Sequence, residues 1–109
     1  MITEIVLFDL PPGLSRTQLL EMCRQTAPGW RANPYLLRMH YLHDPERGTA
    51  GGVYVWRNRE AARHWNEANR AEVEARIGSR LRVMVFETPV LVDNQLGDTL
   101  EAEPAAGWK

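Results

Sequence analysis

The amino-acid sequence predicts an α+β domain of ferredoxin-like plan, in which two strand-helix-strand halves build one antiparallel sheet. Strand-type and helix-type segments follow each other in the order β-α-β-β-α-β. The 109 residues are enough for one hydrophobic core but not for two. Apolar residues occupy both faces of the strand segments, which indicates a sheet that is covered on both sides.

Local signals set the boundaries of these segments. A capping box formed by Ser15 and Gln18 begins the first helix, and Pro28-Gly29 is expected to end it. Asn58 is a favourable N-cap for the second helix, which Gly78 stops. The predicted strands cover residues 2–10, 35–42, 49–56 and 81–92, and the predicted helices cover residues 16–27 and 58–77.

The third strand and the C-terminal segment each have an unusual composition. Gly51-Gly52 lack side chains, which predicts a bulge or a close approach of neighbouring backbone. From Asp93 onward the chain is acidic and rich in Ala, Gly and Pro, which is typical of a mobile arm. We therefore expect one domain over residues 1–94 and an acidic arm, flexible or in contact with a partner, over residues 95–109.

The expected sheet is apolar on two sides. Its last strand places Val83 and Val85 on one face and Met84 and Phe86 on the other. Two helices can cover only one face, and the other would expose more apolar surface than a soluble monomer usually tolerates. The sequence therefore predicts a homodimer formed by sheet-to-sheet packing.

Composition argues against several classes of protein. Thirteen basic and fourteen acidic residues give a formal charge of -1, which does not favour binding to nucleic acid. No window approaches 18 apolar residues, so no membrane span is predicted. The lone cysteine, Cys23, is typical of a reducing compartment, and we expect the protein to be cytoplasmic.

Polar residues share the expected core face of the second helix. Asn69, Glu72 and Arg76 fall in the same sector of the helical wheel as Trp65. A buried polar group without a partner would cost about 1 to 3 kcal/mol. Two interpretations stay open. In the first, Glu72 and Arg76 pair with each other at a sheet edge or contact the C-terminal arm. In the second, the polar groups line a partly wet pocket, and Trp65 forms its aromatic wall.

Metal and nucleophile chemistry find little support in the sequence. His40 and His43 are three residues apart on a strand, so they point to opposite faces and cannot chelate one metal ion. No nucleophile elbow and no glycine-rich nucleotide loop is present, and no cofactor is predicted. His40 shares a strand face with Arg38, and a histidine side chain can exchange a proton near neutral pH, so His40 is either a pocket base or a structural histidine.

Three stretches of the chain carry a resemblance to a known family. They are AGGVYVW at residues 50–56, Asn58 with the helix that bears Trp65, and RVMVFE at residues 82–87. Over roughly residues 5–94 the chain resembles the YdhR-like monooxygenases of the dimeric α+β barrel superfamily, which is related to the antibiotic biosynthesis monooxygenases. The resemblance implies a dimer and a pocket between the sheet and the helices.

The resemblance also implies a function. It suggests a monooxygenase that works without metal or flavin on a small aromatic or quinol-like compound. The implied catalytic residues are His40 as base with Asn69 and Arg76 as anion-stabilising groups, and the implied substrate-binding residues are Trp65, Tyr54, Trp56, Glu72 and Arg38. Two alternatives stay open, namely a non-catalytic ligand-binding or stress-responsive dimeric barrel, and a plain dimeric scaffold.

Overall fold

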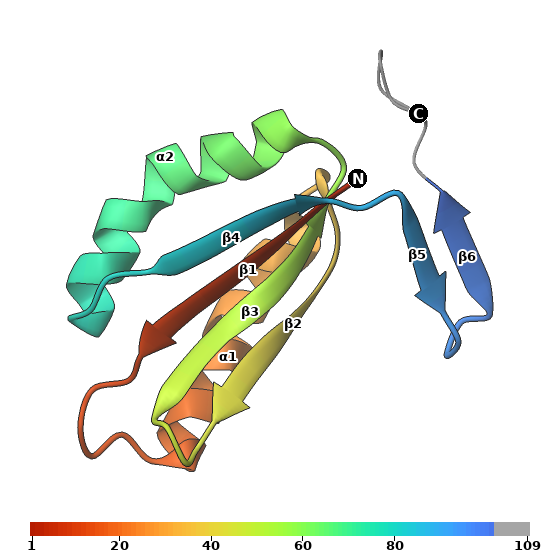
Figure 1. Cartoon of the computed structure of the whole chain (residues 1–109). Helices are drawn as coiled ribbons and strands as arrows, with labels where there is room; N and C mark the ends of the chain where they lie inside the picture. The colour runs from red at the N-terminus through yellow and green to blue at the C-terminus, as the bar shows by residue number, and fades with distance from the viewer. Residues whose placement is uncertain (102–109) are drawn as a thin grey trace.

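A computed structural model describes residues 1–101 of the chain, and it has the ferredoxin-like α+β fold that the sequence predicts (Figure 1). The strands β2, β3, β1 and β4 form one sheet in that order, and each pair of neighbours is antiparallel. The elements are β1 (Ile2–Asp9), α1 (Arg16–Ala32), β2 (Leu36–Asp44), β3 (Thr49–Trp56), α2 (Arg59–Ile77), β4 (Arg82–Glu87), β5 (Val90–Asp93) and β6 (Asp98–Glu101).

Helix α1 begins at its predicted capping box but ends five residues later than expected. The Ser15 hydroxyl accepts from the backbone N–H of Gln18, and the Gln18 side chain accepts from the backbone N–H of Ser15. The helix then continues through Pro28 to Ala32, so the predicted end at residue 27 was wrong. Pro28 removes one backbone hydrogen bond, but continuing the helix packs Trp30 against the core, which offsets that loss.

Helix α2 has the predicted bounds because both of its ends are capped locally. The Asn58 side chain accepts from the backbone N–H of Ala61 at 2.8 Å. Gly78 ends the helix in the left-handed region, with φ of 73°. The N-cap and C-cap expected from the sequence are thereby confirmed.

The two glycines in β3 allow a close approach of backbone. A Cβ atom added to Gly51 would lie 1.8 Å from the carbonyl oxygen of Val6 on the neighbouring strand. The pairing of β1 with β3 runs through Gly51 and Gly52 without a break, so the expected close approach is confirmed and no bulge forms there. The register shift in this sheet lies instead in β2, between Leu36 and Arg38.

The predicted last strand is divided in two. β4 ends at Glu87, and the backbone N–H of Thr88 donates to the carbonyl oxygen of Met1 at 3.0 Å. Pro89 has no N–H group with which to continue the ladder. β5 therefore leaves the sheet and pairs with β6 in a hairpin that projects from the domain (Figure 1). β6 falls within the expected arm, and residues 102–109 lie outside the described part of the chain.

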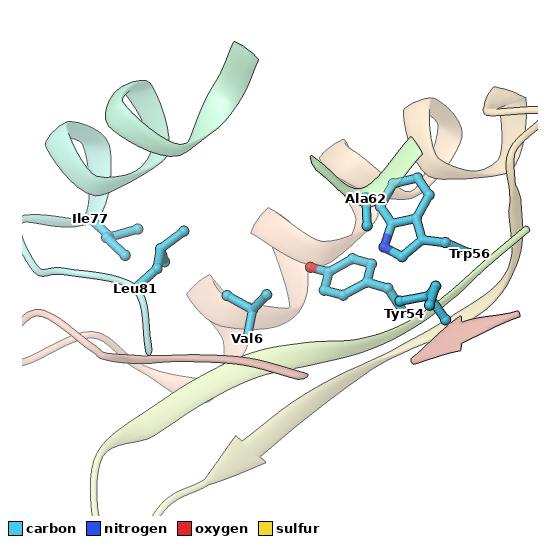
Figure 2. Packing of buried hydrophobic residues seen from close by; sticks show 7 residues of the cluster. Val6, Tyr54, Trp56, Ala62, Ile77 and Leu81 are labelled. Atoms are coloured by element: carbon cyan, nitrogen blue, oxygen red, sulfur yellow. The ribbon is translucent and has the colours of Figure 1, made fainter. Parts of the chain in front are cut away.

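The core lies between one face of the sheet and the helices. Its buried cluster is Ile2, Val6, Tyr54, Trp56, Ala62, Ile77 and Leu81, most of which Figure 2 labels. The opposite face of the sheet, which we call the open face, is not covered by either of the two helices. It carries Ile5, Val53, Met84 and Phe86, and the Phe86 side chain is 52% exposed.

None of the helices within residues 1–101 combines the length and the apolar character that crossing a bilayer requires.

Candidate functional site

A pocket of about 480 Å³ lies between the helix-covered face of the sheet and the two helices. No Cα atom of α1 comes within 8 Å of a Cα atom of α2, so the helices stand apart and leave space above the sheet. The sheet contributes Val6, Phe8 and Tyr54 to the pocket, while Trp30 comes from α1 and Trp65 from α2. A cavity thus lies where the sequence predicts a pocket, and its use as a binding site stays a prediction.

Aromatic rings form the wall at one side of this pocket. The ring of Trp30 lies 4.9 Å from that of Tyr54 and 5.0 Å from that of Trp65, measured between centroids. Tyr54 also stacks on Trp56 with an interplanar angle of 18° and a centroid distance of 6.2 Å. Figure 2 shows the Tyr54 hydroxyl pointing away from Trp56 and toward the side of Val6. Trp56 is 1% exposed and supports the wall from behind without lining the pocket.

The polar stripe of α2 forms part of the pocket lining. The Asn69 amide nitrogen donates to the carbonyl oxygen of Trp65 at 2.9 Å, which fixes the orientation of the amide. Arg76 Nη2 lies 3.1 Å from Glu72 Oε1, and both of these side chains are more than half exposed. The two interpretations left open by the sequence are thus compatible, because Glu72 and Arg76 pair with each other at the mouth of the pocket that they line.

A second group of polar side chains lies on the opposite wall, and the sequence did not reveal it. Tyr41 on β2 is hydrogen bonded to the Thr26 hydroxyl at 2.6 Å and donates to the Cys23 carbonyl oxygen at 3.1 Å. Burial raises the pKa of the Tyr41 phenol and of the Cys23 thiol. These groups therefore stay protonated at neutral pH. Strand alternation from Met39, which packs against the core, was the available signal for Tyr41.

The phenol of Tyr54 also faces the pocket as a neutral group. Its burial, followed by the nearby negative charge of Glu4, raises the pKa of Tyr54 well above its ordinary value. Within residues 1–101 no hydrogen-bond partner for the Tyr54 hydroxyl is found. This hydroxyl is therefore available to a ligand as donor or acceptor.

His40 and Arg38 do not lie in the pocket. His40 pairs with Val53 and Arg38 with Val55, on the open face of the sheet. Arg38 Nη1 instead contacts Asp93 Oδ2 at 2.7 Å. The two residues do share a strand face, as expected, but it is the face away from the helices. Because both faces of the sheet are apolar, strand alternation alone did not reveal which face the helices cover.

A buried carboxylate lies behind the aromatic wall, and sequence reasoning missed it. Glu4 on β1 is 0% exposed and accepts hydrogen bonds from Trp56 Nε1, at 3.2 Å, and from the Asn66 amide on α2. Desolvation raises the pKa of Glu4, while the hydrogen bonds from Asn66 and Trp56 and the charge of Arg70 oppose this rise. The position of Glu4 between the inward-facing Ile2 and Val6 was the available signal.

The predicted site residues thus divide into three groups. The pocket is lined by Trp65, Tyr54, Asn69, Glu72 and Arg76. Trp56 lies directly behind the pocket. The open face of the sheet carries His40 and Arg38. Within the described residues, no three side chains of His, Cys, Asp or Glu come together in a way that could hold a metal ion.

Comparisons with known proteins bear on the fold. No family model matches the chain, and no curated protein matches it. A solved structure of a putative antibiotic biosynthesis monooxygenase from Deinococcus radiodurans matches with a TM-score of 0.65 and 12% identity, over 85% of this chain and 97% of that one. A structural-genomics protein named YJCS matches with a TM-score of 0.60 and 11% identity, over 81% of this chain and 99% of that one.

A third solved structure is that of SnoaB, a cofactor-independent oxygenase from Streptomyces nogalater. It matches with a TM-score of 0.57 and 15% identity, over 80% of this chain and 91% of that one. At these identities the likeness concerns the fold. The chain therefore has the α+β fold of the antibiotic biosynthesis monooxygenase-like proteins.

Proposed function

We propose that the protein is a cofactor-independent monooxygenase, of the YdhR-like kind, that acts on a small aromatic or quinol-like compound in the pocket between sheet and helices. The observation that carries the proposal is the lining of this pocket, in which the rings of Trp30, Tyr54 and Trp65 face a cavity of about 480 Å³. A fold neighbour that is a cofactor-independent oxygenase supports the same reaction class.

The shape and polarity of the pocket fit a flat, partly oxygenated molecule. The Trp30 ring lies about 5 Å from the rings of Tyr54 and Trp65, so the three rings form one aromatic surface on which a flat ligand can stack. Hydroxyl groups of Tyr41 and Tyr54 lie at one side, and Asn69 and Arg76 lie on the α2 side. A ring system with oxygen atoms at both ends would therefore stack in the middle and form hydrogen bonds at either end.

The reaction that this arrangement suits needs only the substrate and oxygen. Loss of a proton gives an electron-rich anion, which passes an electron to O₂, and the two radicals combine into a peroxide at carbon. Cleavage of the O–O bond releases water and leaves a carbonyl group, so R₂CH₂ + O₂ becomes R₂C=O + H₂O. In the proposal the Arg76 guanidinium attracts the anion, and the aromatic wall excludes water from it.

Glu72 takes the role of proton acceptor in this proposal. His40 lies on the other face of the sheet, and Glu72 is the one carboxylate among the described residues that line the pocket. Its contact with Arg76 at 3.1 Å holds the carboxylate on the same wall as the anion-binding group. A positioned general base contributes about a hundred- to ten-thousand-fold to the rate.

The proposal includes a homodimer formed by sheet-to-sheet packing. On the open face, Met84 is 43% exposed and Phe86 is 52% exposed. The open face is therefore a large apolar surface for a protein of this size. A second open face is the simplest cover, because one two-fold operation then buries both surfaces at once.

Oxygen uptake tests the proposed activity. The full chain is offered a panel of hydroquinones and anthrones in an oxygen electrode, and consumption of one O₂ per product is expected. Glu72→Gln should lower kcat at least about a hundredfold, and Trp65→Ala should raise KM. His64→Ala, which changes an exposed residue of α2 outside the pocket, is the matched control and should behave as wild type. The proposal fails if no compound is consumed and none occupies the pocket in soaked crystals.

One observation favours a second candidate, a protein that binds such a ligand without converting it. The polar groups of α2 already have partners, since Asn69 bonds to the Trp65 carbonyl and Glu72 pairs with Arg76. Calorimetric titration with the same panel separates the two functions. Binding that Trp65→Ala weakens, without any oxygen uptake, would support the binding protein and reject the oxygenase.

A further inference from the structure

The side chains on the helix-covered face of β3 decrease in size along the strand. Trp56, Tyr54, Gly52 and Ala50 alternate on this face, and all four residues are buried. Two large rings thus lie at one end of the strand, and almost no side-chain volume lies at the other. The ring of Tyr54 therefore has room to lean along the strand toward Gly52.

The Tyr54 ring occupies the space that a side chain at residue 52 would take. A Cβ atom added to Gly52 would lie 2.8 Å from the Tyr54 hydroxyl oxygen and 2.9 Å from Cζ of the same ring. The rings of Tyr54 and Trp56 are nearly parallel, with an interplanar angle of 18°, so both lean the same way. Figure 2 shows the Tyr54 hydroxyl on the side of Val6, the residue that pairs with Gly52 across β1 and β3. The ring therefore lies along β3, directly over Gly52.

The strand ladder does not itself require a glycine at residue 52. Beyond the chain neighbours, the three heavy atoms nearest to the added Cβ all belong to the Tyr54 side chain, and none is backbone. Gly51 differs in this respect, because its added Cβ meets the backbone of Val6. The φ of Gly52 is not positive, so the local backbone would accept any side chain. The missing side chain at residue 52 therefore serves the placement of the Tyr54 ring rather than the sheet.

Packing alone holds the Tyr54 ring against the strand. Tyr54 is 8% exposed, and within residues 1–101 its hydroxyl has no hydrogen-bond partner that would fix it. Trp56 lies behind the ring, Trp30 lies 4.9 Å from it between centroids, and the cavity lies on its remaining side. Widening the contact of Cζ with an added Cβ from 2.9 Å to an ordinary 3.4 Å would raise the tip of the ring toward the cavity by about 0.5 Å or more.

We infer that Gly52 is a specificity-determining residue, which sets the depth of the pocket by letting Tyr54 lie flat on β3. Tyr54 lines the cavity and Gly52 does not, so Gly52 is a positioning residue that acts through this ring. A ligand of several fused rings fills more of the cavity than a single ring does, and its affinity depends more strongly on the depth. The inference rests on the proposed function for the class of ligand, whereas the position of the ring is a property of the protein alone.

Calorimetric titration without oxygen tests this role, because the proposed reaction then stops at binding. The probes are anthrone, which has three fused rings, and hydroquinone, which has one. Gly52→Ala should raise Kd for anthrone at least about fivefold and Kd for hydroquinone less than about twofold. Gly52→Val should raise Kd for anthrone further. The matched control is Val53→Ile, which adds one carbon atom at the next residue of β3, on the open face, and should leave both Kd values as in wild type.

Removing the Tyr54 ring separates its displacement from a general loss of stability. In a Tyr54→Val background the side chain is too short to reach residue 52, so adding Gly52→Ala should change Kd for anthrone less than about twofold. The ring position is also measured without any ligand, from the aromatic proton resonances of Tyr54, which are sensitive to the Trp30 ring 4.9 Å away. These resonances should move in Gly52→Ala and stay in place in Val53→Ile.

The outcomes separate the role of Gly52 from the proposed function. Unchanged Tyr54 resonances in Gly52→Ala would overturn the role, and so would an equal rise of both Kd values, while the oxygenase proposal would stand. If neither probe binds to the wild type, the proposed function is contradicted, and a displaced Tyr54 ring in Gly52→Ala would still support Gly52 as the residue that sets the depth of the pocket.

Discussion

Glu4 is a charged residue type enclosed in an apolar core. Desolvation favours its neutral form, and the donors that surround it, Trp56 Nε1 and the Asn66 amide, favour the charged form less strongly. The side-chain oxygen of Asn66 is itself buried and has no partner among the described residues. A buried polar oxygen without a hydrogen-bond partner thus lies directly behind the aromatic wall of the pocket. Apolar side chains at this place would pack without the desolvation cost of such a group.

The raised pKa of Glu4 predicts a pH dependence of stability. Because the folded-state pKa lies above the ordinary value of 4.5, the stabilising contribution is complete below that value and is lost as pH rises through the folded-state pKa. Glu4→Gln removes the charge and keeps an acceptor for Trp56. The variant should therefore gain stability relative to wild type as pH rises from about 4 to about 8. The gain is about 1.4 kcal/mol for each tenfold difference between the folded and unfolded acid dissociation constants of Glu4.

Urea unfolding across this pH range measures the difference in free energy of unfolding. The control is Glu67→Gln, which removes an exposed carboxylate in the middle of α2 and leaves the buried one in place. A difference for Glu4→Gln that is constant across the pH range would show that burial does not perturb this carboxyl group.

At the scale of the element, sequence signals succeeded where they are local. Asn58 and Gly78 fix both ends of α2 through their own backbone and side-chain geometry, so these ends were predictable. The end of α1 was not predictable from local signals. Trp30 packs against Tyr54, which is distant in sequence, and this packing overrides the local preference of Pro28 to end the helix. The break after β4 did have a local signal, because Pro89 lacks the N–H group that the ladder needs, and the strand predicted over residues 81–92 overlooked it.

The site was predictable only in part, for the same physical reason. The periodicity of α2 brought Trp65, Asn69, Glu72 and Arg76 onto one face, and these residues do line the pocket. A strand period of two places His40 on a face but does not say which face the helices cover, because that depends on the packing of the whole chain.

Gly51 offers a test of the strand pairing at the centre of the sheet. Gly51→Ala places a Cβ atom 1.8 Å from the Val6 carbonyl oxygen, so β1 and β3 have to separate locally. The expected loss is on the order of 3 kcal/mol in the free energy of unfolding, measured by urea denaturation. Gly29→Ala in α1 is the matched control, because apart from the adjoining helix backbone and the two chain neighbours no atom lies within 4 Å of the added Cβ, and a gain of about 1 kcal/mol is expected. Equal stabilities for the two variants would contradict the close approach.

At the scale of the whole molecule, the pocket lies between two helices that meet through the side chains of Trp30 and Trp65 rather than through their backbones. α1 and α2 have no Cα atoms within 8 Å of each other, and the cavity between them is lined by both helices and by the sheet. A ligand in this cavity would contact all three at once. Binding energy would then be spread over the whole fold rather than over one loop.

Ligand binding is therefore expected to raise the thermal stability of the whole domain. At a free ligand concentration of about one hundred times Kd, the stabilisation is about 2.7 kcal/mol, which corresponds to a rise in Tm on the order of 10 °C. Scanning calorimetry with a compound that binds in titration measures the rise. Trp65→Ala should reduce it at the same ligand concentration, whereas His64→Ala should retain it. A ligand that binds without changing Tm would indicate a site outside the folded core.

The clustering of rings around Tyr54 has a practical consequence. Of the four tryptophans, Trp30, Trp56 and Trp65 gather at or directly behind the pocket, and Trp108 lies outside the described residues. The indole rings of these three tryptophans thus lie at the cavity or directly behind it. Quenching of tryptophan emission and near-ultraviolet circular dichroism can therefore follow occupancy of the pocket without any attached dye.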